Sequence, residues 1–135
     1  MEFNGLSRWQ PQLLAVLRIV AGLLYLAHAI QKFFAFPVPF PMLPLTNQFL
    51  AAGVIELVAG TLITLGLFTR LAAFIASGEM AAAYFIGHFP HGFWPIANKG
   101  ELAVLYCFSF LLLVFVGGGA FAVDAARSGG RVGVR

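Results

Sequence analysis

The chain has 135 residues, of which 61% are hydrophobic and only 10% are charged, and its mean hydropathy is +0.92. Because a water-soluble domain normally carries about 25% charged residues, this composition excludes an ordinary hydrated surface and predicts a single-domain integral membrane protein. The net charge of +3 does not indicate nucleic-acid binding, since the basic residues are scattered between apolar segments and form no patch. The single cysteine, Cys107, excludes an intramolecular disulfide and a self-contained thiol–disulfide exchanger.

Four apolar segments are long enough to cross a bilayer, for which a helix needs about 20 residues. They cover residues 13–34, 46–67, 71–89 and 101–121. The N-terminus has no signal-peptide pattern, so the first segment is expected to remain as a transmembrane helix. The predicted fold class is all-α, an integral membrane four-helix transmembrane bundle over residues 1–124. A Gly- and Arg-rich cytoplasmic tail, residues 125–135, is expected to be disordered.

The connections between these segments differ in kind. In residues 36–44 alternate prolines forbid a helix, and the apolar residues between them predict a segment that lies in the membrane interface, as a lid. The next connection is very short, with Gly66 as a helix stop and Thr69 as the cap of the following helix, which predicts an antiparallel hairpin.

Basic residues predict the orientation in the membrane. Four spans place both termini on one side, which carries Arg8, Arg70, Arg127, Arg131 and Arg135, whereas the other side carries Lys32 and Lys99. The positive-inside rule therefore predicts a multi-pass protein of the cell's inner membrane with cytoplasmic N- and C-termini.

Five ionisable side chains lie inside the apolar segments: Arg18, His28, Glu56, Glu79 and His88. A charge in hydrocarbon is costly unless it is paired, protonated or facing a cavity, so each is a candidate functional residue. Depth along the helices, at about 1.5 Å per residue, predicts an inner layer in which Arg18 and Glu79 pair, with Glu56 near the midplane. An outer layer is predicted from His28, Lys32, His88 and Glu101.

Helical spacing gathers these polar groups on common faces. Arg18, Tyr25, His28 and Lys32 share one face of the first segment, and small residues surround Glu56 on the second. The predicted polar, ligand-binding core consists of Arg18, Tyr25, His28, Lys32, Glu56, Glu79, Tyr84, His88, Asn98 and Glu101. Structural alternatives stay open: Arg18 extending to the headgroups, Arg18–Glu79 as a packing ion pair, and both histidines satisfied by backbone carbonyls.

No metal site is predicted, because helix bundles that bind metals through carboxylates normally use Glu-x-x-His pairs, and none occurs here. A proton pathway through the two polar layers is compatible with the sequence but not required by it.

The chain resembles the DoxX family of small four-helix membrane proteins over about residues 18–124. The resemblance rests on motifs spread along the chain: Arg18-x9-His28-x3-Lys32, Gly53-Val-Ile-Glu56-Leu-Val-Ala-Gly60, Gly66-Leu-Phe-Thr-Arg70, Ser77-Gly-Glu-Met80, Ala83-Tyr84-Phe85, His88, Gly92-Phe-Trp-Pro95, Asn98, Gly100-Glu101, Leu105-Tyr106 and Asp124.

The family takes its name from a subunit of a thiosulfate:quinone oxidoreductase. The resemblance thus implies a quinone-type ligand, a membrane-anchoring role in a redox complex, and a soluble or membrane redox partner subunit. Tyr25, His28, Tyr84 and His88 would supply proton donors to a quinone, and Glu56 and Glu79 a proton route. No cofactor motif is evident, so electrons would come from a partner or substrate.

Whether the protein is itself an enzyme stays open. The alternative is a non-catalytic membrane scaffold or assembly subunit whose buried charges are structural. Partners expected in either case are the lipid bilayer and, because four short helices bury little surface, a second copy of the chain, but no nucleic acid.

Overall fold

The computed structural model describes residues 3–128, whose regular secondary structure is all helical with no strand. A 3-10 turn, η1 (Asn4–Trp9), leads into α1 (Gln10–Phe34), followed by α2 (Asn47–Leu65) and α3 (Thr69–Ala83). The chain continues from α3 through a π-helical turn, η2 (Tyr84–His88), and a 3-10 turn, η3 (Phe89–His91). It then forms the short α4 (Pro95–Asn98), α5 (Glu101–Val116) and the short α6 (Val123–Arg127). The all-α prediction is therefore confirmed.

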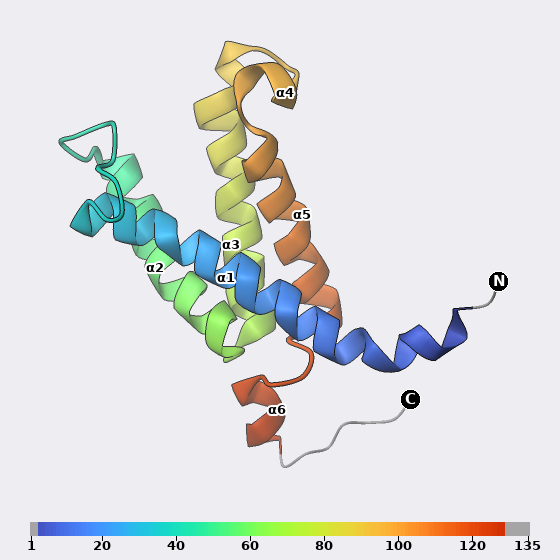
Figure 1. Ribbon diagram of the computed structural model, residues 1–135. Helices are drawn as coiled ribbons and strands as arrows, with labels where there is room; N and C mark the ends of the chain where they lie inside the picture. The colour runs from blue at the N-terminus through green and yellow to red at the C-terminus, as the bar shows by residue number, and fades with distance from the viewer. Residues whose placement is uncertain (1–2, 129–135) are drawn as a thin grey trace.

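The helices form two pairs that diverge. α1 packs on α2, α3 packs on α5, and the two pairs meet mainly through α2 and α3. In Figure 1 the pairs lie together near α6 and separate toward the opposite end, where the loop after α1 and the α4 region lie far apart. The arrangement is a V of two helical hairpins rather than a bundle of parallel axes.

Small residues allow α1 and α2 to approach closely. A Cβ atom at Gly60 would lie 3.1 Å from the backbone of Leu26, and one at Gly22 would lie 2.6 Å from the Thr64 hydroxyl oxygen. The predicted stripe on α2 is accordingly turned inward, with Gly53, Glu56 and Gly60 all buried. Close backbone approach through small residues is the usual means by which membrane helices associate.

The tight turn between α2 and α3 is closed by a residue far along the chain. Gly66 ends α2 in the left-handed region (φ 70°), as predicted. Thr69, however, is not the cap of α3: the Asp124 carboxylate accepts hydrogen bonds from the backbone N–H groups of Phe68 and Thr69 (both 2.9 Å) and from the Thr69 hydroxyl (3.0 Å). Burial acts to raise the pKa of Asp124, but these three donors outweigh it and hold that pKa below its ordinary value.

Two further boundaries differ from the prediction. α5 ends at Val116, five residues before the predicted limit of 121, because Gly117 and Gly119 adopt positive φ angles of 79° and 72° and reverse the chain. The predicted disordered tail is helical at its start, since α6 extends to Arg127. Residues 129–135, which hold Arg131 and Arg135, lie outside the described residues.

The outer surface between the two ends of the molecule is apolar. Leucine, valine, isoleucine and phenylalanine side chains are exposed along α1, α2, α3 and α5. Two helical stretches in the described part of the chain are long and apolar enough to cross a membrane by themselves: Asn4–Phe34, which includes η1, and Asn47–Leu65. α5 is apolar but shorter, and α3 continues into the π-helical turn.

Candidate functional site

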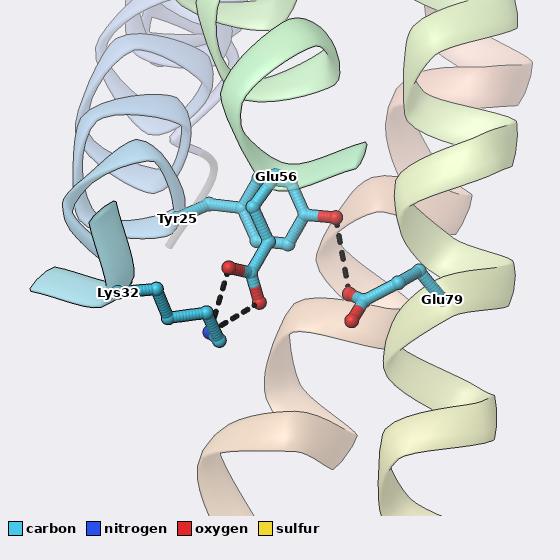
Figure 2. A network of polar contacts seen from close by, with 4 residues as sticks. All are labelled: Tyr25, Lys32, Glu56 and Glu79. Atoms are coloured by element: carbon cyan, nitrogen blue, oxygen red, sulfur yellow. Dashed lines mark hydrogen bonds and ion pairs between the residues drawn. The ribbon is translucent and has the colours of Figure 1, made fainter. Parts of the chain in front are cut away.

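A buried ion pair lies at the junction of α1 and α2. The Lys32 ammonium is 2.7 and 3.1 Å from the two Glu56 carboxylate oxygens, and the two side chains are only 7% and 4% exposed. Figure 2 shows the lysine reaching from the end of α1 to both oxygens of Glu56 on α2. It is the one ion pair within residues 3–128.

Local sequence shapes the surroundings of Lys32. Gly53 of α2 lies against the residues at the end of α1, since a Cβ there would lie 2.8 Å from Phe33 Cζ and 3.4 Å from Lys32 Cδ, of which only the first is closer than ordinary contact. The proline-rich loop covers the other side of the ammonium, with the Phe40 ring centroid 5.3 Å from Nζ and edge-on to Phe49. Within residues 36–44, which were predicted to act as a lid, the Phe40 ring lies over the ammonium of the Lys32–Glu56 pair.

A second carboxylate faces the same space from α3. Glu79 Oε2 accepts a hydrogen bond from the Tyr25 hydroxyl of α1 (3.1 Å), and Figure 2 shows the Glu79 carboxylate pointing to that hydroxyl while the Glu56 carboxylate points to Lys32. Tyr25 is fully buried, so this contact holds α3 against α1 at the point where the two hairpins begin to diverge.

Tyr106 adds a residue of a fourth helix, α5, to the residues of α1, α2 and α3. Its ring lies edge-on to Tyr25 (centroids 5.8 Å apart) and to His28 (6.0 Å), and it stacks on Phe110 (5.6 Å). We call Tyr25, His28, Lys32, Glu56, Glu79 and Tyr106 the polar centre. Tyr106 is part of the family motif but was not included in the predicted polar core. The signal that could have identified it is a single tyrosine hydroxyl within a mainly apolar helix.

Three polar groups of this centre have hydrogen-bonding capacity left over. No hydrogen-bond partner within residues 3–128 is found for the His28 ring, the Tyr106 hydroxyl or Glu79 Oε1. The polar atoms of these three groups are not fully buried. Hydrogen-bonding groups are costly to leave unsatisfied in surroundings of low dielectric constant, which makes these three candidate contacts for a ligand. Together they offer donors and acceptors beside a stack of aromatic rings.

Arg18 lies outside the polar centre and does not pair with Glu79, so the predicted ion pair is wrong. Its guanidinium is fully buried and donates to the carbonyls of Ile63 and Thr64 (both 3.2 Å) and of Ala120 and Phe121 (both 3.3 Å). These carbonyls lie where α2 ends and where the chain turns after α5, and that of Ile63 also accepts the Gly66 N–H. Arg18 therefore fastens three segments at the closed end of the V and does not extend to the headgroups.

Tyr84, His88 and Asn98 form a separate cluster at the open end. Asn98 accepts from the Gly100 N–H (2.8 Å) and donates to the Gly92 carbonyl (2.9 Å) and the Tyr84 hydroxyl (3.2 Å). Tyr84 donates to the Phe93 carbonyl (2.7 Å), and His88 Nδ1 donates to the Asn98 carbonyl (3.0 Å). For His88 the backbone-carbonyl alternative is therefore the arrangement found, and the cluster serves to order the turn between α3 and α5.

The two predicted layers are consequently not those of the structure. Lys32, assigned to the outer layer, pairs with Glu56 of the inner layer, while Arg18 and His88 bond to main-chain carbonyls elsewhere. Glu101 is exposed at the start of α5 with no ion-pair partner in the described part of the chain. Within residues 3–128 there is no group of three or more His, Cys, Asp or Glu side chains suited to holding a metal ion.

The all-helical fold, the apolar exterior and the buried charged centre define a small helical membrane protein. The chain belongs to the DoxX family, whose model matches residues 13–89. It is 47% identical to an uncharacterised protein of Haemophilus influenzae over 90% of this chain and 95% of that protein. It is 29% identical to an uncharacterised membrane protein of Mycobacterium tuberculosis over 87% of this chain and 83% of that one. No solved structure matches.

Proposed function

We propose that this DoxX family protein is a four-span protein of the inner membrane with both termini in the cytoplasm. Support comes from the distribution of exposed charge along the helices. Arg70 lies in the first turn of α3 and Arg127 in α6, at the closed end of the V, whereas Lys99 and Glu101 lie between α4 and the first turn of α5, at the open end (Figure 1). Arg8 lies in η1, ahead of α1. Lys32 no longer counts as a topology marker because its charge is paired with Glu56. The remaining basic residues still favour the closed end as cytoplasmic.

We further propose that the polar centre binds the head group of a small quinone-type ligand. The observation that carries this is the set of unsatisfied polar groups at His28, Tyr106 and Glu79 beside the rings of Tyr25, Tyr106 and Phe110. A quinone head is a flat ring with a carbonyl at each end, so aromatic faces and hydrogen-bond donors are the groups that would recognise it.

The residues present fit such a ligand and suggest their roles. A bound quinone would supply two-electron redox chemistry in the membrane. His28 and Tyr106 would donate hydrogen bonds to its oxygens, and Glu79 would hold or release a proton through its contact with Tyr25. Glu56 would keep its negative charge, offset by Lys32, beside the site and would not exchange protons with the ligand. The protein would act as the membrane subunit of a redox complex, with a partner delivering electrons.

A second candidate is a non-catalytic membrane scaffold. The observation that favours it is the completeness of the Lys32–Glu56 pair, in which one ammonium engages both oxygens of one carboxylate and needs no ligand. Buried pairs of this kind can serve only to fix the packing of two helices.

Binding of an added short-chain quinone separates the two candidates. The melting temperature of purified protein in mild detergent would be measured with increasing decyl-ubiquinone or a menaquinone analogue, for wild type, His28→Ala, Glu79→Gln and the exposed control Glu101→Gln. Each variant is compared with its own ligand-free value, so that a loss of stability is not mistaken for a loss of binding. Saturable stabilisation of wild type and Glu101→Gln, but not of His28→Ala or Glu79→Gln, supports the ligand site. A quinone that stabilises none of the four proteins, or all four equally, supports the scaffold.

A further inference from the structure

Two adjoining hollows lie on the side of α2 and α3 near the closed end of the V, away from the polar centre. The first is an apolar groove of about 310 Å³ between α2 and α3. Its walls are the exposed side chains of Val54, Val58 and Ile75, and its floor includes the buried Ala59 and Ala72. All the residues that line it in the described part of the chain are apolar.

The second hollow is a polar cleft of about 520 Å³ at the start of α3. It is lined by Arg70, Asp124, Ser128 and the glycine turn after α5. Phe68 and Leu71 line both hollows, so the cleft and the groove are neighbours that share one wall.

Positive charge dominates the free groups at this junction. Arg70 Nη1 is anchored by the carbonyls of Val114 (2.9 Å) and Phe115 (2.7 Å), which leaves its Nη2 and Nε without partners among residues 3–128. The Arg127 guanidinium lies 5.3 Å from the centroid of the Phe68 ring. Asp124, the acidic residue of the cleft, is occupied by its three donors at the start of α3.

The groove is long enough for most of an acyl chain within a leaflet. Its lining on α2 runs from Val54 to Leu62, eight residues or about 12 Å at the helical rise, and Phe68 of the following turn extends it toward Arg70. Half of the hydrocarbon core of a bilayer is about 15 Å thick. The groove therefore runs from the level of the two arginines to about the middle of the membrane.

We propose that this junction binds an anionic phospholipid, with one acyl chain in the groove of α2 and α3 and the phosphate beside Arg70 and Arg127. A guanidinium with free donors is suited to a phosphate oxygen, and basic side chains at the membrane surface recognise acidic lipids. A second copy of the chain is a poorer occupant, because a groove this small ending in two arginines matches a single chain with an acidic head. The site is distinct from the polar centre and rests only on the embedding of α2 and α3 in the membrane.

The test is native mass spectrometry of the full chain in detergent, titrated with palmitoyl-oleoyl phosphatidylglycerol and, separately, phosphatidylcholine. Two matched pairs of variants are needed. Arg70→Gln with Arg127→Gln removes the proposed phosphate contacts, and Arg8→Gln with Lys99→Gln removes the same charge from exposed positions elsewhere. Val58→Phe fills the groove, and Val20→Phe adds the same bulk to an exposed position on α1.

We expect wild type to bind phosphatidylglycerol more tightly than phosphatidylcholine. The Arg70/Arg127 double variant should lose about 25-fold in affinity for phosphatidylglycerol, because each basic residue near the membrane surface contributes about fivefold. Val58→Phe should weaken both lipids, and both control variants should match wild type. Equal binding of the two lipids by wild type, or an equal loss in the Arg8/Lys99 control, would overturn the proposal. A Val58→Phe variant that binds both lipids as wild type does would also overturn the proposal, because the acyl chain would then not lie in the groove. A Val58→Phe variant whose only change is the loss of a dimer would overturn it too, because the groove would then be an interface between two copies of the chain.

Discussion

Replacing Glu56 by alanine is expected to destabilise the protein by about 3–5 kcal/mol, the usual result of leaving one member of a buried ion pair uncompensated. At the observed 2.7 Å separation the attraction between the two charges is about 6 kcal/mol for an effective dielectric constant of 20. Desolvating each ion costs several kcal/mol, so the intact pair contributes little in net terms. The lysine that remains after the substitution keeps its desolvation penalty without the attraction.

The same reasoning predicts a rescue. The double variant Lys32→Met with Glu56→Leu removes both charges at similar volume, and it should recover most of the loss, since apolar replacement of a buried pair is commonly neutral or stabilising. Unfolding in mixed detergent micelles, followed by circular dichroism, measures the free energy of unfolding for wild type, both variants and the exposed control Glu101→Ala. A loss below about 1 kcal/mol for Glu56→Ala, the value of an exposed pair, or a double variant no more stable than the single one, would refute this account of the pair.

Three further predictions concern other parts of the fold. Gly60→Ala should lower the melting temperature, because its Cβ would lie 3.1 Å from the Leu26 backbone, whereas Gly78→Ala, with no atom within 4 Å of its Cβ, should raise it by removing a helical glycine. Arg18→Lys should destabilise the protein by about 2–3 kcal/mol, since an ammonium has three donors and cannot span the four carbonyls at the closed end, and buried acceptors left unsatisfied cost about 1–3 kcal/mol; thermal unfolding against wild type measures this, and an unchanged melting temperature would contradict it. The pKa of Asp124 is lower in the folded than in the unfolded state, so its contribution to stability is complete above the ordinary carboxyl pKa and is lost as the pH falls through the folded value. Asp124→Asn should therefore flatten the acid limb of the stability–pH profile, and a variant with the acid limb of wild type would contradict the capping role.

Hydrophobicity and helical spacing were enough to predict the helices and most of the inward faces. The segments predicted at 13–34 and 46–67 match α1 and α2 to within three residues, because their ends are marked by polar residues, prolines and Gly66. The burial of Glu56 among small residues followed from spacing alone. The end of α5 was missed because Gly117 and Gly119 follow an apolar run without any polar residue to mark the boundary.

The partners of the polar groups could not be obtained in the same way. Depth along a helix places Arg18 and Glu79 at one level but carries no information on how α1 and α3 are rotated and inclined. In the V-shaped arrangement Arg18 donates to main-chain carbonyls at two turns, and no side-chain pattern in the sequence marks those carbonyls. Lys32 of the predicted outer layer reaches Glu56 of the predicted inner layer because its side chain is long and α1 packs closely on α2 through small residues.

The capping of α3 by Asp124 is a related case. The residue was noted in the family motif, but its role depends on a contact across more than fifty residues of sequence, which places it against the start of α3. Local capping rules favoured Thr69, the nearest residue with a hydroxyl, and the hydroxyl instead donates to that same carboxylate.

The most direct measurement of the central claim is the identity and amount of small molecule that the protein retains from its own membrane. Protein purified in mild detergent would be examined by native mass spectrometry, and organic extracts of the same samples by ultraviolet spectroscopy and mass spectrometry. The samples are wild type, Glu79→Gln, His28→Ala and Glu101→Gln. A quinone near one equivalent in wild type and Glu101→Gln, and depleted in folded Glu79→Gln and His28→Ala, is the expected result. Folded wild-type protein that retains no quinone, or variants that retain as much as wild type, would contradict a ligand site at the polar centre.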